Sequence, residues 1–306
     1  MKIISKVKTS IHLLEVILFK VDELQKAVGR VELKLLHQIN SNDIHFNEFK
    51  VYSQWGEDGI IQFLINKLEI KNRIFVEFGV QNYTESNTRF LLQNNNWSGL
   101  VIDGSPKNIQ YIKNDPIYWR YNLKADCSFI DKDNINDILI SNGIVDDIGL
   151  LSIDVDGNDY WILDAINCVH PRILICEYNS LFGYKRKVTI PYDQKFVRTK
   201  AHFSNLYYGA SIAALEQLAK LKGYSLVGSN SVGNNLFFVR SDLTSNLPTY
   251  LPEQAYVKAQ FCECRDIDGN LTFLDFNQRL KLISEMPLYD LGLNRLISVN
   301  DLVIDS

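Results

Sequence analysis

The segment 73-RIFVEFGVQNYTESN-87 decides the fold of this chain. Its apolar run, Ile74 to Glu77, is typical of a buried parallel strand and ends on an acid. Phe78 and Gly79 predict a sharp turn, and the polar residues after them predict a helix over 84–93. A strand, a glycine turn and a helix N-terminus present a ligand site at the carboxyl edge of an open α/β sheet.

A second acid follows the next apolar run, LVIDGSP at 100–106, where Asp103 ends the predicted strand. An acid in this position binds the hydroxyls of a ribose. The two segments together predict a nucleoside-type cofactor. The dinucleotide pattern G-x-G-x-x-G is absent, because Gly79 is followed by Val80, Gln81 and Asn82, and this disfavours an NAD-linked enzyme.

Strands and helices alternate along the chain at intervals of 20 to 35 residues from Ile74 onward. We expect later strands over 118–125, 148–154 and 172–177, a long irregular connection over 178–207, and a helix over 211–222. Two last strands, 224–227 and 236–239, form a predicted hairpin. The pattern predicts an α/β fold: a Rossmann-like, doubly wound, mostly parallel sheet of about seven strands with a C-terminal antiparallel hairpin.

The N-terminal residues, 1–45, predict a helical arm in front of this domain. Apolar residues recur there with the a/d spacing of a coiled coil: Leu14, Ile17, Val21, Leu24, Val28, Val31 and Leu35. Either the arm joins copies of the chain into a homo-oligomer, or it is a helix that packs along its own domain. A third alternative, docking on the inner membrane surface, is disfavoured by its modest charge bias. The domain itself is predicted over 46–240, with a helix over 52–68 before the first strand and an extension over 241–306 that covers the core.

The charge, cysteine content and hydropathy of the chain limit which partners and which cellular location we expect for the protein. The chain has 306 residues, a net charge of -4 and five scattered cysteines. No basic footprint points to nucleic acid as a partner, and no run reaches the roughly 20 apolar residues of a transmembrane helix. The odd, scattered cysteines suit a reducing compartment, so we expect a cytoplasmic protein.

The architecture resembles the class I S-adenosylmethionine (SAM)-dependent methyltransferases, and the motifs resemble the FkbM-like family, which methylates sugars and is found with bacterial surface-polysaccharide genes. The resemblance covers about residues 50–240. It is carried by SQWGEDGII at 53–61, FVEFGVQNYTESNTRFLL at 75–92, GLVIDGS at 99–105, LLSIDVDGNDYWIL at 150–163, ICEYN at 175–179, YYGASIAALEQLAKLKGYSLVG at 207–228 and NNLFFVR at 234–240. The usual glycine-rich loop of the superfamily is reduced here to Gly79.

The resemblance implies a place for SAM on this chain. Glu77 and the Gly79 turn would lie under its methionine part, and Asp103 would hold its ribose. Ser105 would contact the adenosine region, Asp126 would accept from the adenine amino group, and Gln54 would reach over the cofactor. With a single glycine in the turn, we also expect backbone amides around 84–87 to hold the cofactor carboxylate.

Acidic and amide side chains also gather after two strands that we expect to be neighbours. Asp154, Asp156 and Asp159 follow one strand, and Glu177 and Asn179 follow the next. One interpretation is a divalent cation, Mg²⁺ or Mn²⁺, held by Asp154, Glu177 and Asn179. Another is metal-free base catalysis by a carboxylate, Asp154, Asp156 or Glu177, or by His202. A helix-capping turn without chemistry is the structural alternative.

The long connection, 178–207, is rich in aromatic and basic side chains. Tyrosines such as Tyr208, just beyond it, are suited to stacking on a sugar ring, and arginines such as Arg198 to binding a phosphate, although a solvated loop would have the same composition. The sequence therefore predicts an O-methyltransferase that acts on a free or nucleotide-linked bacterial sugar of a capsule or lipopolysaccharide precursor. The alternative is a non-catalytic, Rossmann-like protein that binds a nucleotide or assembles a polysaccharide-synthesis complex.

Overall fold

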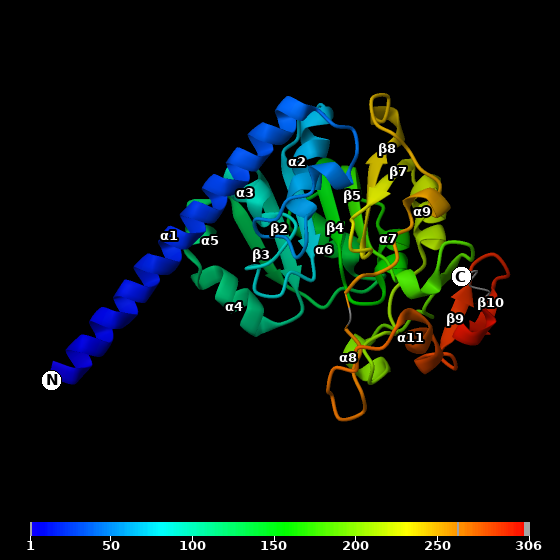
Figure 1. Cartoon of the computed structure of the whole chain (residues 1–306). Coiled ribbons are helices and arrows are strands. Elements are labelled where there is room, and N and C mark those ends of the chain that lie inside the picture. The colour runs from blue at the N-terminus through cyan, green and yellow to red at the C-terminus, as the bar shows by residue number, and fades with distance from the viewer. Residues whose placement is uncertain (1, 262, 303–306) are drawn as a thin grey trace.

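A seven-stranded sheet forms the centre of the structure, a computed structural model that describes residues 2–261 and 263–302 (Figure 1). Its strand order is β3-β2-β1-β4-β5-β8-β7. Neighbours from β3 to β5 run parallel, whereas β8 pairs antiparallel with both β5 and β7. The predicted fold class is confirmed. The strands are β1 (Ile74–Phe78), β2 (Ser98–Asp103), β3 (Leu123–Cys127), β4 (Asp146–Ile153), β5 (Val169–Glu177), β7 (Tyr224–Ser229) and β8 (Asn235–Arg240).

Helices cover both faces of this sheet because its strands are apolar on both sides. In β1, Phe75 faces one buried cluster and Val76 the other, and both side chains are fully buried. The first cluster includes residues of α2 (Glu57–Lys67), α3 (Arg89–Asn95) and α4 (Pro106–Asn114). The second includes residues of α6 (Ile135–Ser141), α7 (Asp159–Ala165) and α9 (Ile212–Leu221).

Two sequence predictions about the first half of the sheet were wrong. The helix predicted over 84–93 begins only at Arg89, and the residues before it form turns. The strand predicted over 118–125 begins only at Leu123, as β3, because α5 (Pro116–Arg120) takes up its first residues. Asp115 caps α5 by accepting from the Ile117 amide at 2.8 Å, and Pro116 stands at its first position, where proline favours a helix start.

The helix predicted over 52–68 is also shorter, because a buried carboxylate holds its first residues in a different conformation. Asp58 Oδ2 accepts from the amides of Val51, Tyr52 and Ser53 at 2.7, 2.6 and 2.8 Å. Residues 51–56 therefore fold as bends around Asp58, and α2 begins at Glu57.

A second, smaller sheet joins the long connection to the C-terminal extension. Its order is β10-β9-β6, formed by β6 (Val188–Thr189), β9 (Pro287–Asp290) and β10 (Arg295–Ser298). Apolar residues of the connection, such as Phe182, share a buried cluster with residues of the extension, such as Ile283. The extension, which also carries α10 (Pro252–Ala255) and α11 (Phe276–Leu282), thus packs on the connection that contains α8 (Arg198–Ala201).

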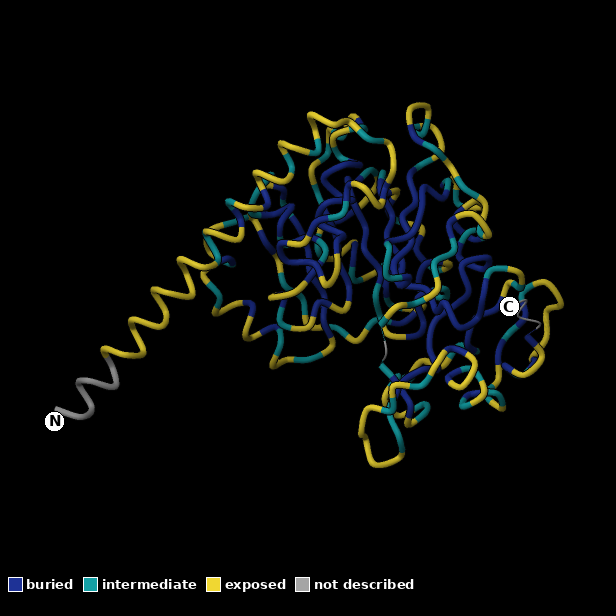
Figure 2. The backbone as a smooth tube through the Cα atoms, in the orientation of Figure 1, coloured by how far each residue is buried: buried dark blue, intermediate teal, exposed yellow. Residues whose placement is uncertain are grey.

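The N-terminal helix α1 (Lys2–Ile39) lies across the body with its second half, and its first half projects beyond it (Figures 1 and 2). Leu33 and Leu36 pack against a cluster that includes Val51 and Phe90. Gly29 lies at this contact, where a Cβ atom would come within 2.4 Å of Val51 Cγ2. In the described part of the chain, no helix has both the length and the hydropathy needed to cross a membrane.

The turn after β1 is the tightest constraint in this fold and can be tested by substitution. Gly79 has a φ of 71°, and an added Cβ would lie 1.8 Å from the Asp154 carbonyl oxygen. Gly143 has a similar φ of 77° but nothing within 4 Å of such a Cβ. We expect Gly79→Ala to lower the free energy of unfolding by about 2–5 kcal/mol, from strain and overlap together. Gly143→Ala, which adds only strain, should cost about 1–2 kcal/mol. If urea denaturation showed that both variants lose the same free energy of unfolding, the close approach of the Asp154 carbonyl to Gly79 would be contradicted.

Candidate active site

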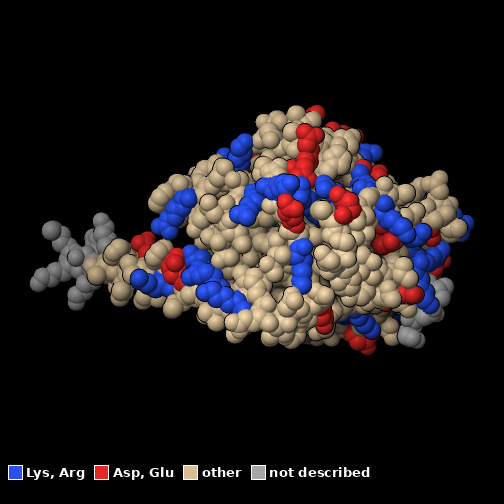
Figure 3. Space-filling view, turned by 90° about the horizontal axis from the view of Figure 1, so that it is seen from above, with Lys and Arg blue, Asp and Glu red and all other residues tan. Residues whose placement is uncertain are grey.

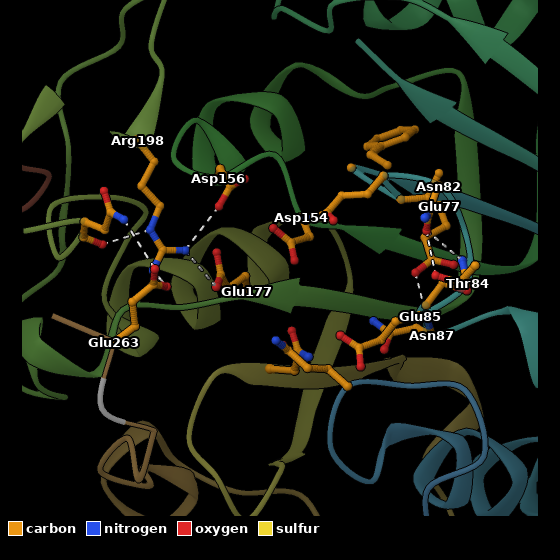
Figure 4. A pocket seen from close by; sticks show the side chains of 18 of the residues that line it. Glu77, Asn82, Thr84, Glu85, Asn87, Asp154, Asp156, Glu177, Arg198 and Glu263 are labelled. Carbon is orange, nitrogen blue, oxygen red and sulfur yellow. Dashed lines mark hydrogen bonds and ion pairs between the residues drawn. The ribbon is translucent and has the colours of Figure 1, made fainter. Parts of the chain in front are cut away.

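A cleft at the carboxyl edge of the sheet consists of two adjoining cavities. The acidic cavity has a volume of about 650 Å³, and its walls include Glu77, Asp154 and Glu177 (Figure 4). The adjoining cavity has a volume of about 360 Å³ and lies beside Asp103 and Phe129. The two share Gly79, Gln81, Asp154 and Asp156 in their linings, so they form one cleft over the ends of β1, β2 and β4.

Gly79 lines the middle of this cleft. Its amide donates to the Ile102 carbonyl at 3.0 Å, and the Asp154 carbonyl approaches its α-carbon from the other side. No side chain fits between these strand ends. The turn therefore leaves backbone exposed to the cleft, as the sequence predicted for a bound cofactor.

Glu77 is a buried acid whose hydrogen bonds come from the turn before α3. Its two oxygens accept from the Asn87 and Thr88 amides at 2.8 and 3.0 Å, and the Thr88 hydroxyl donates at 2.5 Å. Burial nevertheless raises the pKa of Glu77 to about 7. The amides of Asn87 and Thr88 are therefore occupied, and the expectation that amides around 84–87 hold the cofactor carboxylate is wrong for Asn87.

Asp103 and Ser105 lie at the end of β2, in the lining of the adjoining cavity. Asp103 Oδ2 accepts from the Gln81 amide at 2.8 Å, and its Oδ1 accepts from the Ser105 amide and the Asn108 side chain. A carboxylate has about four lone-pair sites, so at least one is left for a hydroxyl group. Ser105 caps α4, because its hydroxyl accepts from the Asn108 amide.

The far wall of the adjoining cavity comes from the loop after β3. Ser128, Phe129 and Ile130 line it, and the last two provide the apolar surface that a flat ring requires. Asp126 does not line either cavity: its carboxylate accepts from the Ser128 hydroxyl at 2.6 Å and from the Asn142 side chain at 2.8 Å. The prediction ended the third strand at residue 125 and put Asp126 after it, whereas β3 continues to Cys127, so Asp126 lies within the strand and Phe129 and Ile130 line the cavity instead.

Three carboxylates meet in the acidic cavity. Asp154, Asp156 and Glu177 each offer an oxygen, and these atoms lie within 4.8 Å of one another. Burial, followed by repulsion from Asp154, raises the pKa of Glu177 well above its usual range, and burial likewise raises that of Asp154. Glu177 Oε2 is buried and has no hydrogen-bond partner. An unpartnered buried carboxylate oxygen on a residue that lines a cavity is suited to receive a ligand or a proton.

One guanidinium group, from Arg198 of α8, faces these acids. Its Nη1 lies 3.1 Å from Asp156 Oδ1 and 3.9 Å from Glu177 Oε1, and its Nη2 lies 3.7 Å from Glu263 Oε2 (Figure 4). The guanidinium also lies over the Tyr208 ring at 3.7 Å. The sequence had suggested a phosphate or solvent for Arg198, but the structure pairs it with carboxylates from three separate segments.

Three other predicted residues have different surroundings from those expected. The Asn179 side chain donates to the carbonyls of Leu206 and Tyr208, and its oxygen accepts from the Leu181 amide, so it caps a short helix and is not placed as a metal ligand. His202 bonds to the Ser204 hydroxyl and lies outside the linings of both cavities, which removes it as a base here. Asp159, the first residue of α7, accepts from the Val155 and Gly157 amides and so holds the loop that precedes the helix.

Gln54 and Glu263 lie on the outer walls of the acidic cavity. Gln54 belongs to the bends before α2 and not to the helix in which the sequence predicted it. Glu263 belongs to the C-terminal extension, and no sequence pattern around it indicated a role in the site. The Phe261 ring, two residues before it, stacks on Trp55 at a centroid distance of 6.4 Å, which brings this segment to the cleft.

Comparisons with known proteins give fold relatives only. No protein-family model and no curated protein matches the chain. Matching solved structures include a SAM-dependent methyltransferase from Clostridium acetobutylicum, at 12% identity over 60% of this chain and 89% of that chain, with a TM-score of 0.38. The N-terminal domain of EvdMO1 with SAH bound matches at 10% identity over 67% and 94%, with a TM-score of 0.38. TrmK from M. capricolum in complex with SAH matches at 12% identity over 60% and 70%, with a TM-score of 0.36. At TM-scores below 0.5, these likenesses assign no activity to the chain.

The buried Glu77 predicts a specific pH dependence of stability. A carboxyl group that titrates near pH 4.3 when unfolded and near 7 when folded binds more protons in the folded state between these values. It therefore makes the free energy of unfolding fall as pH rises through this window. We expect Glu77→Gln to reduce that slope in urea denaturation between pH 5 and 8. The exposed control Glu69→Gln should leave it unchanged, and an equal slope in all three proteins would contradict the assignment.

Proposed function

We propose that this protein is a SAM-dependent O-methyltransferase that acts on a sugar hydroxyl. The observation that carries the proposal is the two-part cleft: a nucleoside-sized cavity beside a strand-end acid opens into a cavity rich in carboxylates. The two halves meet at Gly79, where backbone is exposed. The strand order, with β8 inserted antiparallel between β5 and β7, agrees with the resemblance to class I methyltransferases.

The adjoining cavity suits the adenosine part of SAM. Asp103 would accept from a ribose hydroxyl with its remaining lone pair, and Ser105 lies next to it. Phe129 and Ile130 would pack on the adenine ring. This assignment puts the methionine part past Gly79, in the acidic cavity.

The acidic cavity suits the positive charges of SAM. Among its described lining residues are six carboxylates and one guanidinium: Glu77, Glu85, Asp154, Asp156, Glu177 and Glu263, with Arg198. Burial and then repulsion among the close carboxylates raise the pKa values of Asp154 and Glu177, so a bound cation is favoured there. A neutral or anionic cofactor would gain nothing from this arrangement.

When bound, SAM supplies a methyl group that its sulfonium has already activated. The protein must align the acceptor hydroxyl and remove its proton. Glu177 is our choice for the proton acceptor, because its Oε2 is buried and unpartnered. Asp154, within the same cluster, would share the proton, and Arg198 would limit the repulsion between the two.

The rest of the acidic cavity suits an acceptor with several hydroxyls. Its walls carry many side chains able to donate and accept hydrogen bonds: Gln54, Asn82, Thr84, Ser86, Asn87, Thr199, Asn205 and Asn235. A sugar needs such partners, because each unpaired polar group in a dry site costs affinity. The polar lining thus supports a sugar acceptor, free or nucleotide-linked, as in capsule or lipopolysaccharide precursors.

The cluster of three carboxylates also fits a divalent cation, although the Arg198 guanidinium competes for the same oxygens. Asp154, Asp156 and Glu177 would hold Mg²⁺ or Mn²⁺ through oxygen ligands, and the ion would lower the pKa of a bound hydroxyl. Arg198 already provides a positive charge to Asp156 and Glu177. We therefore propose that the cation and Arg198 compete for these two carboxylates.

Cofactor binding is the first test of the proposal. We expect calorimetry to detect binding of SAM and of its demethylated product, SAH. Asp103→Asn should weaken SAM binding by about tenfold or more, since a charge-assisted hydrogen bond to ribose is lost. Asp126→Asn, a strand-end acid outside both cavities, is the matched control and should change it by less than about twofold. The absence of binding by the wild type, or equal effects of both variants, would refute the proposal.

Competition with Arg198 can be tested without an acceptor. We expect Mn²⁺ to bind the wild type weakly and Arg198→Ala about tenfold more tightly, because the substitution leaves the three carboxylates without their counter-charge. Lys195→Ala, a charge removed from the same connection but outside the cavity lining, is the control. Calorimetry or electron paramagnetic resonance measures both. Unchanged or weaker Mn²⁺ binding by Arg198→Ala would rule the competition out.

A further inference from the structure

We propose that α1 pairs with α1 of a second copy of this chain, in a parallel two-stranded coiled coil. The contact is the heptad stripe, which we define as Leu14, Ile17, Val21, Leu24, Val28, Val31 and Leu35. This inference is independent of the proposed function, because none of these residues lines the cleft.

The heptad stripe faces away from the protein's own domain. All seven of its side chains are 47–66% exposed. The contact with the body uses a different row, in which Lys26 and Gly29 are buried and Leu33 and Leu36 are partly buried. At 100° per residue, the two rows lie about 130° apart round the helix. The sequence had offered pairing and packing on the domain as alternatives, but the exposed stripe remains after the packing is complete.

The stripe is long and regular enough for a partner helix. It spans three heptads, from Leu14 to Leu35, or about 33 Å of helix. It runs unbroken from the projecting half of α1, where Figure 2 shows exposed residues, to the half that lies on the body. A second helix with the same spacing can pack on the stripe, because each of its a and d side chains would enter a hole between four side chains of this helix.

The residues that flank the stripe allow a second copy to approach. In a parallel pair in register, each g position faces the e position five residues later on the partner. These pairs are Leu13 with Leu18, Lys20 with Gln25, and Ala27 with Glu32. None brings like charges together, and the first adds apolar contact. The same surface is therefore complementary to itself, as a two-fold interface requires.

A lipid surface explains the stripe less well. Figure 3 shows acidic and basic side chains interspersed on the face of the molecule that it draws. Between residues 9 and 39, α1 has four acidic and four basic side chains: Glu15, Asp22, Glu23 and Glu32, with Lys20, Lys26, Arg30 and Lys34. Helices that bind anionic lipid have a polar face dominated by Lys and Arg. Lys2, Lys6 and Lys8 precede this segment in the sequence, so vesicle binding is tested directly below.

The test compares two aspartates on the same helix. We expect the full chain to sediment with the mass of two copies. Val28→Asp places two carboxylates opposite each other in the middle of the pair and should raise the dimer dissociation constant at least 100-fold. Arg30→Asp, exposed but about 160° round the helix from position 28, should change it by less than threefold. Far-ultraviolet circular dichroism checks that both variants keep their helix content.

Three outcomes would overturn the inference. One is a wild type that stays monomeric at every concentration, and another is a Val28→Asp dimer as tight as the wild type. The third is a monomer that floats with vesicles of phosphatidylethanolamine and phosphatidylglycerol, in which Val28→Asp abolishes flotation, because lipid would then be the occupant. For the parallel orientation, oxidised Val28→Cys should form a disulfide-linked dimer that Arg30→Cys does not form, and failure to cross-link a wild-type-like dimer would exclude it.

Discussion

Burying carboxylates without losing their hydrogen bonds is the constraint that shapes the carboxyl edge of this sheet. Desolvation disfavours a charged carboxylate, so the chain must supply donors wherever an acid is buried. Asp58 is surrounded by the amides of residues 51–53, Glu77 by those of residues 87 and 88, and Asp159 by those of residues 155 and 157. Three loops thus take their shape from one acid each, and this is why two predicted helices begin later than their sequences suggest.

Among the acids of the cleft, Glu177 is the exception to this rule. Glu177 has an oxygen without a partner, and its main compensation is a guanidinium 3.9 Å away. Arg198 comes from the connection after β5, outside the regular alternation of strands and helices. Its own position depends on the Asn205 carbonyl, the Tyr208 ring and Glu263 of the extension. The long connection and the C-terminal extension therefore set the charge balance in the acidic cavity, whose other acids come from the ends of the strands.

The sequence predicted those parts of the site that follow from strand ends. In a parallel sheet, the last residue of each strand reaches the same edge, so Glu77, Asp103, Asp154 and Glu177 could be grouped without a structure. Asp126 and Asn179 followed the same rule and failed. Their partners, Asn142 and the carbonyls of residues 206 and 208, lie 16 to 29 residues further along the chain. Nothing in the local pattern of a strand end shows that its side chain is already bonded.

The N-terminal helix shows a second limit of periodicity. A heptad pattern reveals an apolar face but does not reveal whether that face meets the protein's own domain or another molecule. Here Gly29 decides. Glycine costs about 1 kcal/mol in a helix interior, and it would weaken a coiled coil if it lay in the stripe. It lies instead on the row that contacts the body, where its missing side chain lets α1 approach Val51 and Phe90. The position of Gly29 therefore marks the face of α1 that touches the body, and the apolar row left over is the one that we propose to pair.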